Sequence, residues 1–290
     1  MEAASGYLQI GELSRRSGVS TELLRAWERR YGLLRPARSE GGFRLYSPQD
    51  ERRVTVMRNH LERGLSAAQA ARLTLEEAER RPDEAPALAR GIESLRDALD
   101  ALDETAAHTA LDRLLSDFSV ETVLGEVVLP YLHELGERWA RGEASVADEH
   151  FASNLLRGRL LGLARGWDGG SGPRALLACA PGEQHDLALI VFGLVLRELG
   201  WRITFLGPDT PLDTLDDATR TLEPAAVVIA ASSPERIAGD EVSLRKLARN
   251  APLWIAGAGA SSVVGKKTGA RQLDGDPLGA AALVARAQRE

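Results

Sequence analysis

The sequence predicts a multi-domain protein with α and α/β parts: a winged helix-turn-helix, a four-helix bundle and a doubly wound, Rossmann-like parallel sheet. Helical spacing of apolar residues recurs from residue 8 to residue 167 and is interrupted by one short strand. After the glycine-rich stretch 169–173, short β-rich runs alternate with helices, which is the pattern of a parallel sheet covered on both faces. The predicted boundaries are 1–75 for the winged helix-turn-helix, 76–87 for a linker, 88–167 for the bundle and 168–290 for the sheet domain.

The first domain is expected to contain four helices and a wing. A short helix starts near Leu8 and ends near Gly18; Ser20 then caps a second helix over residues 21–31. Gly41 and Gly42 mark a turn, and residues 43–46 alternate like a strand. Further helices start at residues 47–48 and 65–67, and the stretch after residue 74 is rich in Glu, Arg and Pro.

In the bundle, helices are expected over residues 88–102, 110–115, 123–139 and 146–163. In the sheet domain, strands are expected at 175–180, 202–206, 226–230 and 253–256, with helices near 186–199, 211–222, 240–249 and 277–288. Ligands of such sheets bind beyond the carboxyl ends of the strands, so the segments of interest are 181–187, 207–210, 231–234 and 257–262.

Charge is distributed unevenly along the chain. Residues 1–75 hold thirteen arginines against eight acidic residues, a charge of +5, whereas the remainder holds 23 basic and 34 acidic residues, a charge of −11. A basic head on an acidic body indicates that the head alone meets a polyanion. No run approaches the ~20 apolar residues that span a bilayer, and the start lacks the signal-peptide pattern. We therefore expect a cytoplasmic protein without a membrane partner.

The strongest local pattern lies in this basic head. Residues 25–32 read R-A-W-E-R-R-Y-G, and residues 41–46 read G-G-F-R-L-Y. A cationic helix and a glycine-tipped hairpin that exposes Arg44 and Tyr46 suit a DNA groove and its phosphates. A solvated, arginine-rich helix is the alternative that composition alone leaves open. The two runs resemble the MerR family of winged-helix regulators, which implies a double-stranded DNA operator, binding as a dimer, and DNA contacts from Ser20, Thr21, Arg25, Tyr31, Arg44 and Tyr46.

Two further patterns point to a ligand. Nine residues separate Trp139 from the pair Glu149-His150, and His185 lies on the loop after the first predicted strand. A histidine there projects over the carboxyl edge of the sheet, where a metal or a flat macrocycle can dock. Neutral imidazole is a good cobalt ligand, and a neighbouring acid, Glu183 or Asp186, is expected to bind its other nitrogen. Taken singly, each histidine is more often a capping, solvated or bundle residue.

The order of bundle, sheet and E-x-H loop resembles the cobalamin-binding module of methionine synthases and cobalamin-dependent mutases. Joined to a MerR head, the chain resembles the CarH/LitR-type regulators, photoreceptor repressors that sense adenosylcobalamin. This resemblance implies that His185 is the lower axial cobalt ligand and that Trp139, Val146, Glu149 and His150 line the upper face. The remaining expected cofactor contacts are Glu183, Asp186, Asp209, Thr210, Ser232 and Gly257.

The same resemblance implies a repressor that changes its oligomeric state, between dimer and tetramer, with adenosylcobalamin and light. Four positions depart from the family pattern: Ala140 replaces a histidine, Ala188 and Ala256 replace glycines, and Ala230 replaces a serine. The alternative is a regulator with a degenerate, B12-independent cobalamin domain that senses another chromophore or a protein antirepressor. A corrinoid enzyme for methyl transfer is disfavoured, because a DNA-binding head has no place in it; we predict that the chain is not an enzyme.

Overall fold

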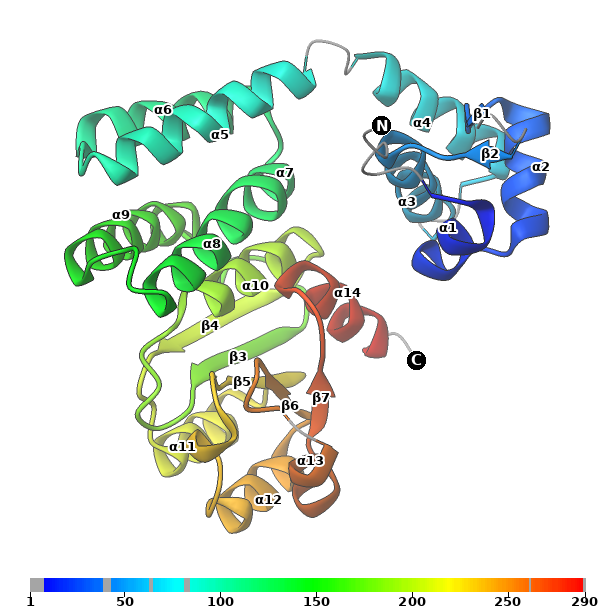
Figure 1. The fold of residues 1–290 in the computed structure, drawn as a ribbon. Helices are drawn as coiled ribbons and strands as arrows, with labels where there is room; N and C mark the ends of the chain where they lie inside the picture. Colours follow the sequence, from blue (N-terminus) through cyan, green and yellow to red (C-terminus); the bar gives the residue numbers. More distant parts are fainter. Residues whose placement is uncertain (1–7, 39–42, 63–64, 81–83, 261, 289–290) are drawn as a thin grey trace. The chain divides into compact units, whose positions relative to one another are not determined.

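The computed structural model describes residues 8–38, 43–62, 65–80, 84–260 and 262–288. The chain divides into two compact units, residues 1–90 and 91–290, and each is described by itself (Figure 1). Among the described residues, no helix is long and apolar enough to cross a membrane. The turn predicted at Gly41 and Gly42 lies outside the described residues.

Unit 1 is a helix-turn-helix followed by a small wing and two more helices. Its elements are α1 (Ile10–Ser17), α2 (Thr21–Tyr31), β1 (Ala37–Arg38), β2 (Arg44–Leu45), α3 (Pro48–Glu62) and α4 (Ala67–Arg80). The Ser20 side chain accepts a hydrogen bond from the Leu23 amide and so caps α2, as predicted. Gly18 and Gly32 end α1 and α2 with φ of 67° and 63°, a conformation that favours glycine.

The hydrophobic core of unit 1 is formed by residues of α1, α2, α3 and α4 together with Tyr46 of the wing. The strands β1 and β2 are antiparallel, and Tyr46 bridges back to Leu8. Trp27 is 3% exposed and packs in this core. Its buried neighbours are Leu13, Val19, Leu24, Leu33, Leu34, Tyr46, Val54, Met57, Ala70 and Ala71.

Most of the segment predicted as a linker is helical. Helix α4 continues to Arg80 and α5 (Glu84–Asp100) begins four residues later. The glutamates and arginines of this segment are good helix formers. Pro86 lies in the first turn of α5, where no amide hydrogen is needed. Of the segment predicted as a helix tail and linker, residues 76–80 continue α4 and residues 84–87 begin α5.

The helical part of unit 2 contains the four helices that periodicity predicted. They are α5, α6 (Glu104–Asp117), a continuous run of α7 (Val120–Val123), η1 (Leu124–Val128) and α8 (Leu129–Ala140), and α9 (Val146–Leu163). The segment η1 is a π-helical turn directly before Pro130. Proline has no amide hydrogen and crowds the carbonyl one turn earlier, so the helix is wound more loosely here.

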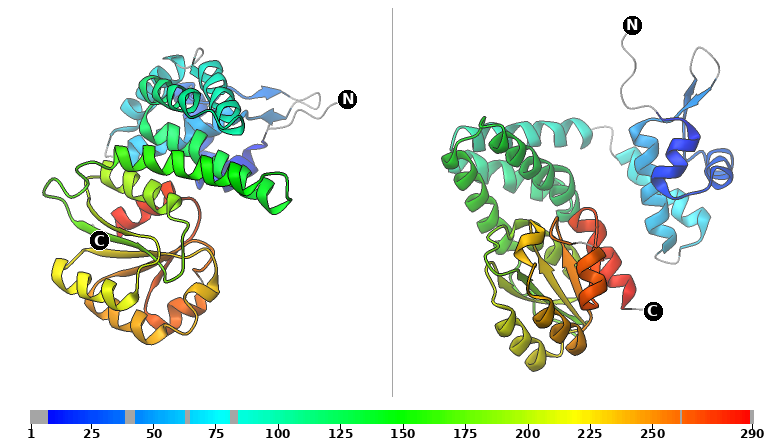
Figure 2. Two further views of the ribbon diagram at one scale, coloured as in Figure 1. Left: turned by 90° about the vertical axis from the view of Figure 1, so that its left-hand side faces the viewer. Right: turned by 60° about the horizontal axis from the view of Figure 1, so that its bottom comes forward.

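The sheet of unit 2 is parallel throughout, in the order β4-β3-β5-β6-β7. Its strands are β3 (Arg174–Cys179), β4 (Arg202–Gly207), β5 (Ala226–Ala230), β6 (Leu253–Ala256) and β7 (Arg271–Leu273). Helices α10 (Leu187–Glu198) and α14 (Pro277–Ala287) cover one face. Helices α11 (Leu212–Leu222), α12 (Glu241–Asn250) and α13 (Ser262–Thr268) cover the other (Figures 1 and 2). This confirms the predicted doubly wound fold.

The strand order places a topological switch point beside β3. The chain leaves β3 toward β4 on one side and later returns to β5 on the other. The loops that follow β3 and β5 therefore diverge at the carboxyl edge of the sheet, which is where ligands of this architecture bind. Helix α9 packs against α10, so the helical part and the sheet belong to one compact unit.

Candidate functional site

The loop after β3 holds His185 through a buried carboxylate. Glu183 is 1% exposed, and its Oε1 atom accepts hydrogen bonds from the His185 amide at 2.9 Å and from His185 Nδ1 at 2.6 Å. Its Oε2 atom accepts a third from the Ser232 amide at 2.7 Å, on the loop after β5. Glu183 thus joins the two loops that meet at the switch point.

These hydrogen bonds fix the protonation of the pair. Burial by itself raises the pKa of Glu183, but the hydrogen bonds from Ser232 and His185 outweigh burial and lower that pKa to about 2. At neutral pH the carboxylate is ionised and accepts hydrogen bonds only, so His185 Nδ1 carries the hydrogen. In the neutral tautomer that this hydrogen bond selects, the lone pair lies on Nε2, and the ring is 78% exposed, so a metal ion can reach that nitrogen. Of the two acids that the sequence proposed as partners of this ring, Glu183 is the one bonded to it.

The loop after β4 is bonded to the same segment. The Asp209 amide donates to the Glu183 carbonyl at 2.8 Å, and Asp209 Oδ1 accepts from the Gly182 amide at 2.6 Å. The Thr210 amide donates to the Cys179 carbonyl at 3.2 Å. Asp209 has a φ of 49°, a strained conformation for a residue with a side chain. These bonds hold the loop of His185 on its second side.

The loops after β5 and β6 approach each other closely. The amides of Ala231 and Gly259 donate to the carbonyls of Ala256 and Ala231. Gly257 has a φ of 84°, and a Cβ atom there would lie 2.5 Å from the Ala231 carbonyl oxygen. Ser232 and Gly257 are both exposed at this edge. The four segments selected from the sequence therefore lie along the same edge of the sheet.

The helical residues of the expected site lie where α8 ends and α9 begins. Trp139 is 55% exposed and Val146 is 59% exposed, which is unusual for large apolar side chains. Glu149 Oε1 accepts a hydrogen bond from Ser153 at 2.7 Å, and Glu149 Oε2 lies 3.6 Å from the exposed His150 ring. The turn between α8 and α9 and the carboxyl ends of β3 and β4 lie on the same side of unit 2, at the left in Figure 1.

Three other expected ligand residues have different surroundings. Asp186 is 2% exposed and pairs with Arg157 of α9 instead of the histidine ring. Thr210 is buried, and its hydroxyl donates to the Gly207 carbonyl. Asp209 is exposed. The four alanines that depart from the family pattern are exposed (Ala140, Ala188) or half-buried (Ala230, Ala256), so none of their methyl groups lies in the core.

In unit 1, Glu28 joins the second helix to the wing. Its carboxylate accepts hydrogen bonds from Arg44 Nε at 3.0 Å and from the Tyr46 hydroxyl at 2.9 Å. Tyr46 is 0% exposed, so the prediction that it is displayed on the wing is wrong. Burial, followed by the hydrogen bond to Glu28, raises the pKa of Tyr46 to about 12. Tyr46 is a core residue that fixes Glu28, and Glu28 positions Arg44.

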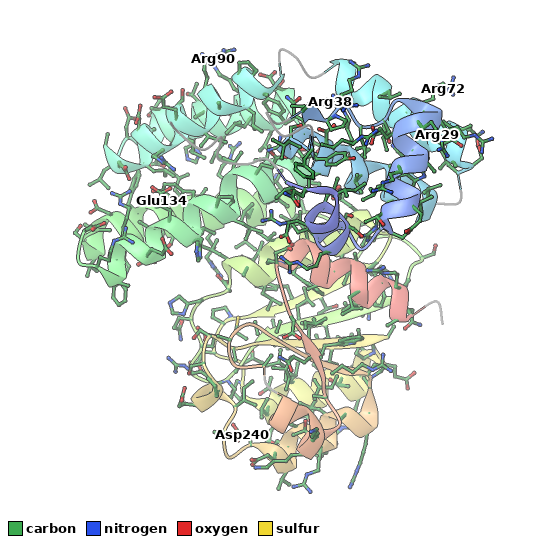
Figure 3. The ribbon with its side chains drawn as sticks, turned by 45° about the vertical axis from the view of Figure 1, so that its right-hand side comes forward. Arg29, Arg38, Arg72, Arg90, Glu134 and Asp240 are labelled. Atoms are coloured by element: carbon green, nitrogen blue, oxygen red, sulfur yellow. The ribbon has the colours of Figure 1, made fainter. Side chains whose placement is uncertain are left out.

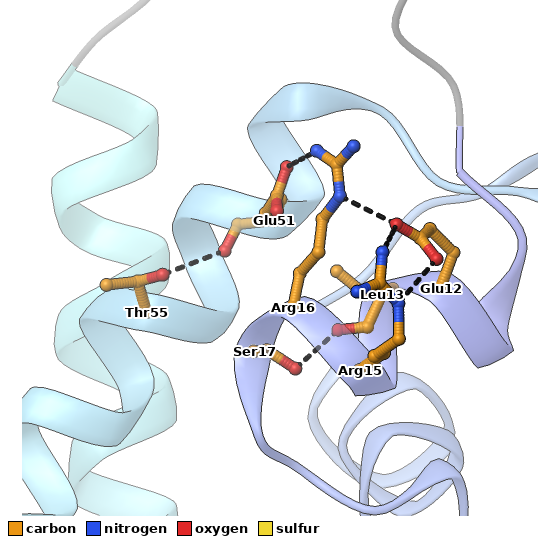
Figure 4. Close-up of polar contacts among 7 residues, drawn as sticks. All are labelled: Glu12, Leu13, Arg15, Arg16, Ser17, Glu51 and Thr55. Atoms are coloured by element: carbon orange, nitrogen blue, oxygen red, sulfur yellow. Dashed lines mark hydrogen bonds and ion pairs between the residues drawn. The ribbon is translucent and has the colours of Figure 1, made fainter. Parts of the chain in front are cut away.

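Some arginines of unit 1 are matched by acids within the same unit. Arg15 and Arg16 of α1 both bond to Glu12, and Arg16 also pairs with Glu51 of α3 at 3.7 Å (Figure 4). The two arginines lower the pKa of Glu12 to about 2. In contrast, Arg25 and Arg29 of α2 are exposed and form no ion pair within the described ranges (Figure 3 labels Arg29).

A shallow hollow adds two residues that the sequence did not indicate. It has a volume of about 210 Å³ and lies between the start of α1, α2 and the wing. Its lining residues are Gln9, Ile10, Arg25, Phe43 and Arg44. Gln9 lies outside both motifs, and Phe43 lies within the run 41–46 but was given no role of its own. The expected DNA contacts Ser20 and Arg25 are exposed, while Thr21 and Tyr31 are half-buried.

Comparison with known proteins agrees with this division of the chain. Residues 8–77 match the model of the MerR HTH family regulatory proteins, and residues 92–161 match the model of the B12 binding domain. The chain is 35% identical to the HTH-type transcriptional repressor CarH of Myxococcus xanthus over 260 residues, 85% of this chain and 87% of that protein. It is 36% identical to the repressor CarA of the same organism over 259 residues, 87% of each chain.

A solved structure shows the same fold in unit 2. The monomethylamine corrinoid protein of Methanosarcina barkeri superposes with a TM-score of 0.56 and 16% identity, over 67% of this chain and 96% of that one. At this identity the likeness concerns the fold alone.

Proposed function

This chain belongs to the CarH and CarA family of MerR-type regulators with a B12 binding domain, and from that premise we propose that it is a transcriptional repressor whose operator binding is controlled by a cobalamin held at His185. The family is one of DNA-binding regulators, and the chain is not an enzyme.

The observation that carries the cofactor proposal is the orientation of one imidazole. Glu183 accepts a hydrogen bond from Nδ1. Nε2 is left exposed at the switch point as the ring nitrogen that can offer its electron pair to a metal ion. Nε2 of His185 would hold the cobalt ion that a bound cobalamin would supply, because a neutral imidazole nitrogen is a good ligand for such a metal. The residues present fit this group: a single oriented donor, and an exposed tryptophan on the adjacent helices.

We assign the other contacts by their position around that donor. Asp209, Thr210, Ser232 and Gly257 lie along the carboxyl edge of the sheet, where the remainder of a large cofactor would follow the loops. Trp139, Val146, Glu149 and His150 would contact its opposite face. The exposed apolar surface of Trp139 and Val146 favours a corrinoid with a bulky upper group, so we propose adenosylcobalamin as the natural form. Light is the proposed second signal.

On the DNA side, we propose contacts from Ser20, Thr21, Arg25, Tyr31 and Arg44. An exposed helix start on α2 and the arginine of the wing suit a major groove and the adjacent phosphates. Binding to two half-sites requires a homo-oligomer, a dimer or a tetramer, and we propose that adenosylcobalamin in the dark favours a tetramer that grips the operator and that light dissociates it. A protein antirepressor is a further candidate partner.

The cofactor proposal is tested by measuring whether the protein retains adenosylcobalamin. The full chain is mixed with adenosylcobalamin in the dark, passed over a desalting column, and its visible spectrum and corrinoid content are measured. We expect retention near one corrinoid per chain, lost in His185→Ala and kept in the control His133→Ala, which removes an exposed imidazole of α8. Duplexes selected from a random pool should then bind differently with and without the cofactor.

Two results would contradict this function. No retained corrinoid, or equal retention by His185→Ala, would overturn the assignment of His185. DNA binding that ignores cobalamin but responds to another chromophore or protein would favour the B12-independent regulator. That alternative depends on the four departures from the family pattern, Ala140, Ala188, Ala230 and Ala256, of which Ala140 has no side-chain atom that could bind cobalt.

A further inference from the structure

The residue directly after His185 connects the sheet to the helices. Asp186 precedes α10, and both of its carboxylate oxygens accept hydrogen bonds from Nε of Arg157, at 3.0 and 2.8 Å. Arg157 lies near the middle of α9. The Asp186 side chain is 3% exposed and that of Arg157 is 39% exposed. A carboxylate so buried needs a cationic partner, because leaving it alone in the interior is strongly unfavourable.

Asp186 is fixed at its backbone as well. Its carbonyl accepts the first hydrogen bond of α10, from the Ile190 amide. The preceding carbonyl, that of His185, lies 3.9 Å from the buried thiol of Cys179 at the end of β3. Burial, followed by the charges of Asp186 and Glu183, raises the pKa of Cys179 to about 12. The start of α10 is thus held by β3, by its own helix and by α9.

The two acids beside His185 consequently have separate roles. Glu183 orients the ring with respect to the sheet, and Asp186 ties the loop that carries the ring to α9. Helix α9 begins with Val146, Glu149 and His150, the residues proposed for the opposite face of the cofactor. One ion pair therefore links the two walls of the proposed site.

We propose that Arg157 is a positioning residue: through Asp186 it fixes the distance between the His185 loop and the α8–α9 wall, and so sets how firmly a corrinoid is held between them. The inference rests on the proposed function, because the quantity that it explains is the retention of the cofactor. Arg157 itself touches neither the ring of His185 nor any other residue assigned to the cofactor except Asp186 among the contacts of the described chain.

The test compares two arginines of one helix. Arg157→Met removes the link, and Arg159→Met is the matched control, because Arg159 pairs instead with exposed Asp112 of α6. Arg157→Lys keeps the charge but removes Nε, the atom that both carboxylate oxygens of Asp186 contact. With adenosylcobalamin as the probe, we expect Arg157→Met to release the corrinoid at least tenfold faster than wild type. Arg159→Met should stay within twofold, and Arg157→Lys should lie between them.

Two readouts separate positioning from a merely structural role. The visible spectrum of the corrinoid retained by Arg157→Met should shift toward that of corrinoid free of imidazole ligation, whereas a purely structural loss would lower the melting temperature without changing the spectrum. Without any ligand, hydrogen exchange of residues 183–190 should speed up in Arg157→Met and not in Arg159→Met. This hydrogen-exchange comparison does not depend on cofactor binding.

The outcomes are distinct for the two proposals. If the wild-type protein retains no corrinoid, the proposed function fails, whereas the hydrogen-exchange comparison still decides whether Arg157 holds the loop. If the wild type retains corrinoid but Arg157→Met matches Arg159→Met in release rate, spectrum and exchange, the role of Arg157 is overturned and the proposed function stands.

Discussion

At the scale of single residues, two carboxylates three positions apart illustrate what geometry adds to a motif. The sequence offered Glu183 and Asp186 equally as partners of the His185 ring. The backbone of the loop turns Glu183 inward beneath the ring, while Asp186, at the start of α10, faces α9. The choice between them depends on the side of the loop to which each side chain points, and a linear pattern does not contain that information.

The first prediction concerns Glu183→Gln. The carboxylate accepts three hydrogen bonds from N–H donors. An amide has only one accepting oxygen, so its NH₂ group must face a donor. We expect the ligand-free protein to lose about 1–3 kcal/mol of unfolding free energy, and the cofactor to be retained less well. The measurement is denaturant unfolding of both proteins, with corrinoid retention alongside.

The pH dependence of that difference has a definite sign. The folded-state pKa of Glu183, about 2, lies below its ordinary value of 4.5. The stabilisation by the ionised carboxylate is therefore complete above about pH 4.5 and disappears as the pH falls through about 2. The unfolding free energies of wild type and Glu183→Gln should converge over this interval. A difference that stays constant down to pH 2 would show that ionisation of Glu183 does not contribute.

At the scale of elements, long periodic segments were predictable and short ones were not. Helix α2 and strands β5 and β6 have the predicted bounds, and α9 and α11 agree within one residue. The sequence analysis missed β7 and α13: an edge strand of three residues, Arg-Gln-Leu, and a helix of seven are too short to show a period.

The wing shows a different limit. Alternation correctly predicted the strand around Arg44 and Leu45, but two-residue strands do not reveal which side faces the core. Tyr46 was assigned to the DNA side, whereas the bridge to Leu8 and the Glu28 carboxylate draw it inward. The ligand-binding edge of the larger sheet was predictable, because all strands of a parallel sheet end at the same edge, and the loop that follows each strand therefore lies there.

The close approach of two of those loops leads to a prediction with an internal control. Gly257 and Gly275 have similar positive φ angles, 84° and 89°, so an alanine is strained at either position. A Cβ at Gly257 would lie 2.5 Å from the Ala231 oxygen, whereas nothing lies within 4 Å at Gly275. Gly257→Ala should therefore cost about 1–3 kcal/mol more than Gly275→Ala in thermal or denaturant unfolding. Equal costs would mean that the two loops separate easily.

At the scale of the whole molecule, the charge asymmetry agrees with the division into units. The excess of arginine lies in residues 1–75, and the acidic excess lies in the remainder, which contains the sheet and most of the bundle. Within the described residues of unit 1, Glu12 and Glu51 pair with the α1 arginines and Glu28 pairs with Arg44 of the wing, whereas Arg25 and Arg29 of α2 are exposed without an ion pair. Net charge predicted a polyanion partner; the ion pairs indicate which arginines remain for it.

That distinction can be measured by the salt dependence of DNA binding. Each phosphate contact that is removed lowers the slope of log K against log salt by about 1. Arg44→Ala should weaken binding to a selected duplex, lower the slope by this amount, and do so similarly across DNA sequences if Arg44 contacts phosphate. Arg15→Ala removes the same charge from a side chain of α1 that is bonded to Glu12, as Arg44 is bonded to Glu28, but that lies outside the proposed DNA contacts, so its slope should stay near that of wild type. If the affinity of Arg44→Ala is unchanged, the wing does not touch DNA; if Arg15→Ala lowers the slope equally, long-range charge, and not contact, determines the binding.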